Sequence, residues 1–188
     1  MVKQRRNGRV RKDEWLATAL DELERGGIEA VRVERLAKLL AISKSGFYWH
    51  FKDRKDLHQH LLDYWIHEFT EVVTSNPLLI RGKPIERLEK VSALIEENDL
   101  GKYDLAIRAW AQYDETAREA VERATEIRLD FLRNIFREIG FVGEELEMRS
   151  TLFVAYHTWE SATFARQSSR KRTRMRRRRL QLLTSQPT

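Results

Sequence analysis

The stretch 33–55 constrains the fold of this chain more than any other part of the sequence. Its apolar residues recur every three or four positions as far as Leu40, as they do on one face of a helix. Ile42 follows at a tight turn, and Ser43 is a residue type that often caps the start of a helix. The next helix, predicted over about residues 44–50, is too short to be stable alone. The pattern therefore predicts two short helices that are joined by a turn and anchored to their neighbours.

The second of these helices is unusual in what it leaves exposed. Phe47 and Phe51 lie four positions apart, so we expect both to anchor the helix to the core. The outward positions then hold a cation, a hydroxyl, a glycine and two aromatic rings: Lys44, Ser45, Gly46, Tyr48 and Trp49. Such a surface adds little stability but suits a helix inserted into the major groove of DNA. An ordinary core-forming helical hairpin is the alternative, and it leaves the exposed aromatic residues unexplained.

Residues 27–57 resemble the DNA-binding domain of the tetracycline-repressor (TetR) family. The matching positions keep the spacing of the family pattern and are Gly27, Leu36, Ala37, Ile42, Ser43, Phe47, Tyr48, His50, Phe51, Lys55 and Leu57. The resemblance implies an all-α fold with two parts. Residues 1–57 would form a three-helix DNA-binding domain with a helix-turn-helix, and residues 58–169 a helical ligand-binding and dimerisation domain.

The exposed positions and the resemblance together give the residues expected at the DNA. These are Lys44, Ser45, Gly46, Tyr48, Trp49, His50 and Lys55. We expect Lys44 and Ser45 to read base edges. Tyr48 is expected to contact a thymine methyl group or a phosphate, and the last three residues to hold the DNA backbone.

Three positions depart from the family pattern. Arg32 stands where the family usually has a capping threonine, so any cap must come from elsewhere, at a cost of roughly 0.5–2 kcal/mol. Ala41 replaces the glycine of the turn, and it carries strain if its φ is positive. Gly46 lies inside the recognition helix, where glycine costs about 1 kcal/mol relative to alanine. We interpret Gly46 as allowing a close approach to DNA, with sequence drift as the alternative.

Charge is distributed unevenly along the 188 residues. Residues 1–57 carry 14 Lys or Arg and 9 Asp or Glu, residues 58–169 carry 13 and 20, and residues 170–188 carry 8 and none. A basic N-terminal part on an acidic body indicates a polyanion bound at one end. With 8 Gly, 3 Pro and no Cys, helices should dominate and disulfides are excluded. No signal peptide or membrane-spanning run is visible, and we expect a cytoplasmic protein.

The apolar periodicity predicts further helices over about residues 12–25, 53–73, 84–98, 103–113, 116–139 and 144–166. Asp53 is the expected N-cap of the second of these. Arg54 and Lys55 lie in its first turn, where the helix dipole disfavours cations but a bound phosphate would accept them. This position supports the expectation that Lys55 touches the DNA backbone.

The last predicted helix carries two apolar stripes. One steps by four and three through Met148, Leu152, Ala155, Trp159 and Ala162, and the other comprises Leu146, Phe153, Tyr156 and Phe164. One stripe can face the body and leave the other for a partner. With helix 116–139, this predicts a four-helix homodimer interface across a two-fold axis, which the family resemblance also implies.

Tyrosine, tryptophan and phenylalanine are frequent in the predicted body. Buried Trp and Tyr need a partner for their polar tips, and a cavity lined by rings suits a flat or greasy molecule. We therefore expect a small apolar or aromatic effector to contact Trp110, Tyr113, Phe131 and Tyr156. The alternative is that most of these rings are core residues.

The sequence therefore predicts a dimeric, ligand-responsive regulator of transcription that binds a near-palindromic operator, most often as a repressor in this family. A ligand-independent architectural DNA-binding protein is the alternative, because both ends of the chain are basic. We expect no enzyme, cofactor or metal site, since no catalytic or metal-ligand signature is visible. The arginine-rich residues 170–188 are expected to form a disordered tail.

Overall fold

The computed structural model describes residues 10–164 and 168–186 of the chain, with the side chains of 161–164 left aside. All regular structure in these residues is helical, so the predicted all-α fold is confirmed. The chain divides into two compact units, residues 1–64 and 65–188. Each unit is described by itself below.

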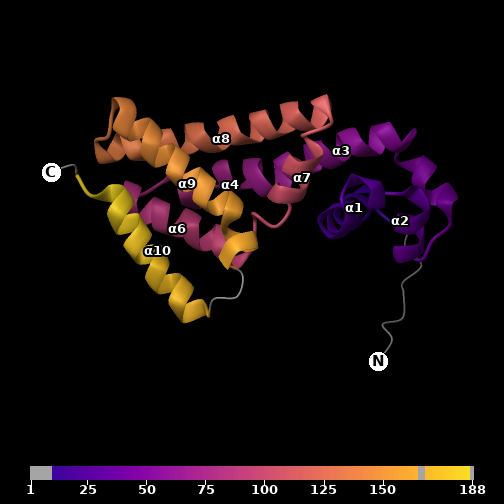
Figure 1. The fold of residues 1–188 in the computed structure, drawn as a ribbon, viewed down its shortest axis with the longest axis horizontal. Helices are drawn as coiled ribbons and strands as arrows, with labels where there is room; N and C mark the ends of the chain where they lie inside the picture. Colours follow the sequence, from indigo (N-terminus) through magenta and orange to yellow (C-terminus); the bar gives the residue numbers. More distant parts are fainter. Residues whose placement is uncertain (1–9, 165–167, 187–188) are drawn as a thin grey trace. The chain divides into compact units, whose positions relative to one another are not determined.

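The first unit holds the predicted helix-turn-helix. It contains α1 (Lys12–Gly26), the 3-10 helix η1 (Ile28–Ala30), α2 (Val33–Leu39), the 3-10 helix η2 (Lys44–Trp49) and the start of α3 (Arg54–Ile66) (Figure 1). Its fully buried side chains include Trp15, Leu20, Leu36, Phe47 and Leu57. The ring of Phe47 meets the ring of Trp15 edge-on, with 5.5 Å between the centroids. Phe47 and Phe51 are both buried, so their predicted anchoring role is confirmed.

Two of the departures from the family pattern, Ala41 and Arg32, lie at the two ends of α2. Ala41 has φ 51°, in the left-handed region that favours glycine, so the predicted strain is confirmed. Arg32 occupies the N-cap of α2 without capping it through its side chain. Ser43 stands at the N-cap position of η2, but its hydroxyl lies 2.7 Å from the Ser45 hydroxyl and not on a backbone amide. Ser43 therefore occupies the predicted N-cap position, but its hydroxyl pairs with that of Ser45 and makes no capping hydrogen bond.

Helix α3 begins as predicted and continues into the second unit. The Asp53 carboxylate accepts a hydrogen bond from the Asp56 amide at 2.8 Å, which confirms the expected N-cap. After Ile66 the helix changes to one π-helical turn, His67–Glu71, which is followed by α4 (Val72–Thr74). Single π-turns of this kind occur often at functional sites.

The second unit is a helical bundle. It contains α5 (Pro77–Ile80), α6 (Pro84–Glu97), α7 (Asp104–Trp110), α8 (Glu115–Ile139) and α9 (Gly143–Phe164) (Figure 1). The long helices α8 and α9 pack against each other after a turn at Gly140, which has φ 110°. The core between the helices is apolar and includes Leu88, Val91, Leu132, Ile135, Phe136 and Phe153.

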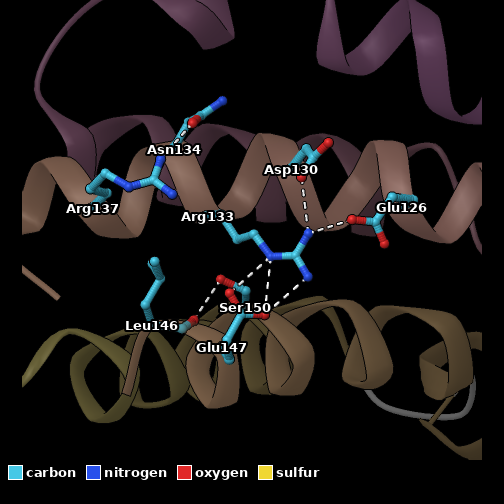
Figure 2. A network of polar contacts seen from close by, with 8 residues as sticks. All are labelled: Glu126, Asp130, Arg133, Asn134, Arg137, Leu146, Glu147 and Ser150. Atoms are coloured by element: carbon cyan, nitrogen blue, oxygen red, sulfur yellow. Dashed lines mark hydrogen bonds and ion pairs between the residues drawn. The ribbon is translucent and has the colours of Figure 1, made fainter. Parts of the chain in front are cut away.

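A polar clamp joins α8 to α9 outside this core (Figure 2). The guanidinium of Arg133 on α8 donates hydrogen bonds to Glu147 on α9, and also to Glu126 and Asp130 on its own helix. These bonds, first those to Glu147, raise the pKa of Arg133. The three carboxylates are exposed, so the clamp contributes modestly to stability and mainly fixes how the two helices align.

The expected disordered tail is instead a helix, α10 (Ser169–Thr184), which packs beside α6 (Figure 1). Leu180 and Leu183 are buried in the core of the unit. Arg176 and Arg179 both form ion pairs with Glu96, at 2.9 and 2.7 Å. The prediction was wrong because it treated the arginines as one solvated run. Two of them lie on the face of α10 that carries the leucines, where their stems pack and their charges are paired.

Among the described residues, no helix combines the length and the apolar character that crossing a membrane requires.

Candidate nucleic-acid interface and ligand cavity

Helix η2 presents its aromatic side chains to solvent. Tyr48 is 67% exposed and Trp49 is 71% exposed, whereas the preceding residue, Phe47, is fully buried. The Phe47 ring meets the Tyr48 ring edge-on at 5.3 Å, which orients Tyr48 outward. The expected exposure of these two aromatic residues is therefore confirmed. The helix itself is of the 3-10 type, which is common in pieces this short.

Lys44 and Ser45, the expected base readers, are exposed at the start of η2 and hold local partners. Lys44 Nζ lies 2.7 Å from Glu34 Oε1 on α2, and both side chains are exposed. The hydrogen bond from Lys44 lowers the pKa of Glu34, so this carboxylate is ionised at neutral pH. Binding of Lys44 to a base edge would exchange the Glu34 carboxylate for a neutral acceptor, so Glu34 competes with DNA for this cation.

Gly46 and His50 have contacts inside the first unit. A Cβ added at Gly46 would lie 3.2 Å from Ile42 Cδ1 and 4.0 Å from Trp15 Cζ2. The close approach that this glycine allows in the structure is thus to Ile42, and its contact with DNA stays a prediction. His50 is half-buried, and its Nε2 lies 2.9 Å from the carbonyl oxygen of Val10.

Arg54 and Lys55 begin α3 but differ in their surroundings. Arg54 donates a hydrogen bond to the carbonyl oxygen of Ile28 at 3.0 Å and lies 3.6 Å from Glu29. Lys55 is exposed beside the N-terminus of the helix, where its charge opposes the dipole. Lys55 is therefore the better placed of the two cations for an external phosphate.

These features define a helix-turn-helix domain of the DNA-binding class followed by a helical body. Residues 16–61 match the model of the family described as bacterial regulatory proteins, tetR family. The TetR resemblance is thereby confirmed for the N-terminal domain, and the body has the fold of solved regulators of this kind.

Three solved structures illustrate the similarity of the fold. A transcriptional regulator from Rhodococcus sp. Rha1 superposes with a TM-score of 0.74 at 14% identity, over 93% of this chain and 98% of the other. A TerR/AcrR-family regulator from Aquifex aeolicus VF5 gives 0.67 at 18% identity, over 92% and 98%. AibR, solved with isovaleryl coenzyme A and operator DNA, gives 0.68 at 15% identity, over 92% and 97%. No curated protein is similar enough in sequence to match.

A cavity that is partly open to solvent lies within the second unit. Its walls come from the π-turn, α6, α7, α8 and α9, and they are mostly apolar, including Phe69, Val91, Ile95, Phe131, Leu132 and Phe153. The π-turn contributes Phe69 and Thr70, so an occupant would touch the same continuous helical stretch that begins as α3.

The lining of the cavity includes a buried ion pair. Arg128 donates to both carboxylate oxygens of Asp104 and, through Nε, to the Thr70 hydroxyl at 2.9 Å. The indole Nε1 of Trp65 donates to Asp104 at 3.2 Å, and the Arg128 guanidinium lies 5.5 Å from the Trp65 ring centroid. The two charges compensate each other, and the remaining acceptors and donors of the pair are largely satisfied.

His157 and Thr158 on α9 also line the cavity. His157 Nδ1 lies 2.9 Å from Glu160, and its Nε2 lies 3.1 Å from the Ser92 hydroxyl. Burial lowers the pKa of the His157 imidazole, so the ring is neutral at physiological pH. Arg179 of α10 donates to the same Ser92 hydroxyl, which links the C-terminal helix to the hydrogen bonds of His157.

The four predicted effector residues do not come together in the cavity. Phe131 lines it. Trp110 is buried outside the lining, and Tyr113 is 94% exposed. Tyr156 lies half-buried under Arg179, whose Cζ is 3.6 Å from the ring centroid. Sequence reasoning also missed Thr158, His157 and the Asp104–Arg128 pair, because an isolated polar residue in a helix gives no signal of what its side chain contacts.

The two stripes of α9 face different surroundings. Phe153 is buried and Leu146 nearly so, whereas Met148, Leu152 and Trp159 are about half exposed. Ala162 and Phe164 lie outside the residues whose side chains are described. The stripe through Leu152 is therefore the one that remains for a partner.

Proposed function

We propose that this chain is a ligand-responsive, sequence-specific DNA-binding repressor that works as a homodimer. The observation that carries the proposal is the TetR-type domain with exposed Tyr48 and Trp49 on its recognition helix. An effector-binding body is supported by the apolar cavity in the second unit. The related fold of AibR accommodates both isovaleryl coenzyme A and operator DNA.

The DNA contacts follow from this proposal. Lys44 and Ser45 read base edges, Tyr48 and Trp49 lie against the groove wall, and Lys55 holds a phosphate. In a homodimer, two such helices enter successive major grooves of a near-palindromic operator. The predicted functional boundary after Leu57 stays a prediction, since α3 runs through it without a break.

Selection of bound sequences from random duplex DNA tests the proposal. The wild-type chain is expected to enrich a near-palindromic sequence with half-sites about one helical turn apart. The variant Tyr48→Ala with Trp49→Ala should lose this enrichment while keeping its helical circular dichroism. Leu39→Ala, which trims a half-exposed apolar side chain on α2, is the control and should keep it. Binding without any enriched sequence would favour the architectural alternative.

A further inference from the structure

Thr158 is the feature of the cavity that the internal contacts of the protein do not explain. It lines the cavity and is only 4% exposed. Its hydroxyl Oγ1 has no hydrogen-bond partner among the described residues. A buried hydroxyl without a partner lowers the stability of the folded protein by roughly 1–3 kcal/mol. Such groups are rare in native proteins, and each needs an explanation.

The other polar side chains of the cavity lining have hydrogen-bond or ion-pair partners within the protein. Thr70 accepts from Arg128, and Thr74 donates to the carbonyl oxygen of Thr70 at 3.1 Å. Asp104 and Arg128 neutralise each other, and His157 bonds through both ring nitrogens. Within the described lining, therefore, the charged side chains are paired, and Thr158 Oγ1 is the side-chain polar atom that has no hydrogen-bond partner.

We propose that the cavity binds an uncharged, largely apolar molecule whose single hydrogen-bonding oxygen pairs with the Thr158 hydroxyl. This inference rests on the proposed role of the second unit as an effector-binding domain, and it specifies the class of effector. A carboxylate in the same place would have to be buried without a cation or take Arg128 from Asp104. The first course leaves the ligand's charge buried without a partner, and the second leaves Asp104 without one; both are strongly unfavourable.

Three naphthalene probes of similar shape separate these possibilities by titration calorimetry. They are 2-acetylnaphthalene, which has one carbonyl oxygen, its hydrocarbon isostere 2-isopropenylnaphthalene, and the anion 2-naphthoate. The wild-type protein should bind the ketone roughly three- to ten-fold more tightly than the hydrocarbon, as expected for one hydrogen bond. It should bind the anion at least roughly ten-fold more weakly than the ketone.

Thr158→Val and Thr74→Val form a matched pair of variants. Both remove one hydroxyl from the same cavity, but the Thr74 hydroxyl is already bonded to the backbone. Thr158→Val should abolish the preference for the ketone, and Thr74→Val should retain it. Thermal unfolding without ligand checks the fold, and it should show no loss of stability in Thr158→Val because that variant gives up no hydrogen bond within the protein.

The proposal is overturned if 2-naphthoate binds as tightly as the ketone, if Thr158→Val keeps the ketone preference, or if none of the three probes binds. Fluorescence anisotropy with the selected operator separates this result from the proposed function. If the ketone binds through Thr158 but leaves the affinity for the operator unchanged, the class of ligand stands. The role of that ligand in releasing DNA would then be rejected.

Discussion

The exposed stripe of α9 gives the sharpest test of the proposed homodimer. Leu152 is 51% exposed and Trp159 is 55% exposed in a single chain. Burying a whole leucine side chain stabilises by about 1.5–3 kcal/mol, so its exposed half is worth about 1 kcal/mol. A tryptophan buries roughly 150–250 Å², so its exposed half, about 110 Å², is worth about 3 kcal/mol at 25 cal/mol per Å².

Two-fold symmetry doubles this sum to about 8 kcal/mol per dimer, before the costs of association. Leu152→Asp combined with Trp159→Asp removes that contribution and places two carboxylates in each half of the interface. Even half of the loss, about 4 kcal/mol, raises the dimer dissociation constant roughly a thousand-fold. We expect a monomer in sedimentation equilibrium, and weak binding to the operator because only one recognition helix is then engaged at a time.

A matched double variant controls for the loss of exposed apolar surface in general. Leu78→Asp with Leu182→Asp changes two side chains that are 74% and 73% exposed and lie outside the stripe. This control should dimerise as the wild type does. A folded Leu152→Asp, Trp159→Asp protein with an unchanged dissociation constant would refute the reasoning, and the dimer would have to use another face.

Three further predictions concern the first unit. Lys55→Ala should weaken binding to every DNA sequence alike and reduce the salt slope by about 1, as measured by anisotropy at several salt concentrations; an unchanged slope would remove Lys55 from the interface. Lys44→Ala should instead reduce the discrimination between bases at one half-site position by about 1–3 kcal/mol. Glu34→Gln, which removes the ion pair with Lys44, should strengthen binding without altering the preferred base. Equal loss on all sequences would make Lys44 a phosphate contact. Ala41→Gly should relieve the left-handed strain of about 1–2 kcal/mol, offset in part by unfolded-chain entropy, and raise the urea midpoint; a lower midpoint would contradict this.

The sequence alone determined the first unit in considerable detail. Spacing placed Phe47 and Phe51 in the core and left Tyr48 and Trp49 outside, and the structure agrees. It also located the strained turn at Ala41 and the cap at Asp53. These features are local: they depend on helical periodicity and on turn chemistry within a few residues, which a single sequence states directly.

Only the tertiary structure shows which segment of the chain packs against each face of a helix. The periodicity of α9 revealed two stripes but not which of them is covered, since that depends on the packing of α8 and α6. The arginine-rich segment became a docked helix because Glu96, more than seventy residues earlier, pairs with Arg176 and Arg179. The orphan hydroxyl of Thr158 likewise exists only where the walls of the cavity meet. Burial and charge pairing between distant segments carry no periodic signal in the sequence, so only the folded chain reveals them.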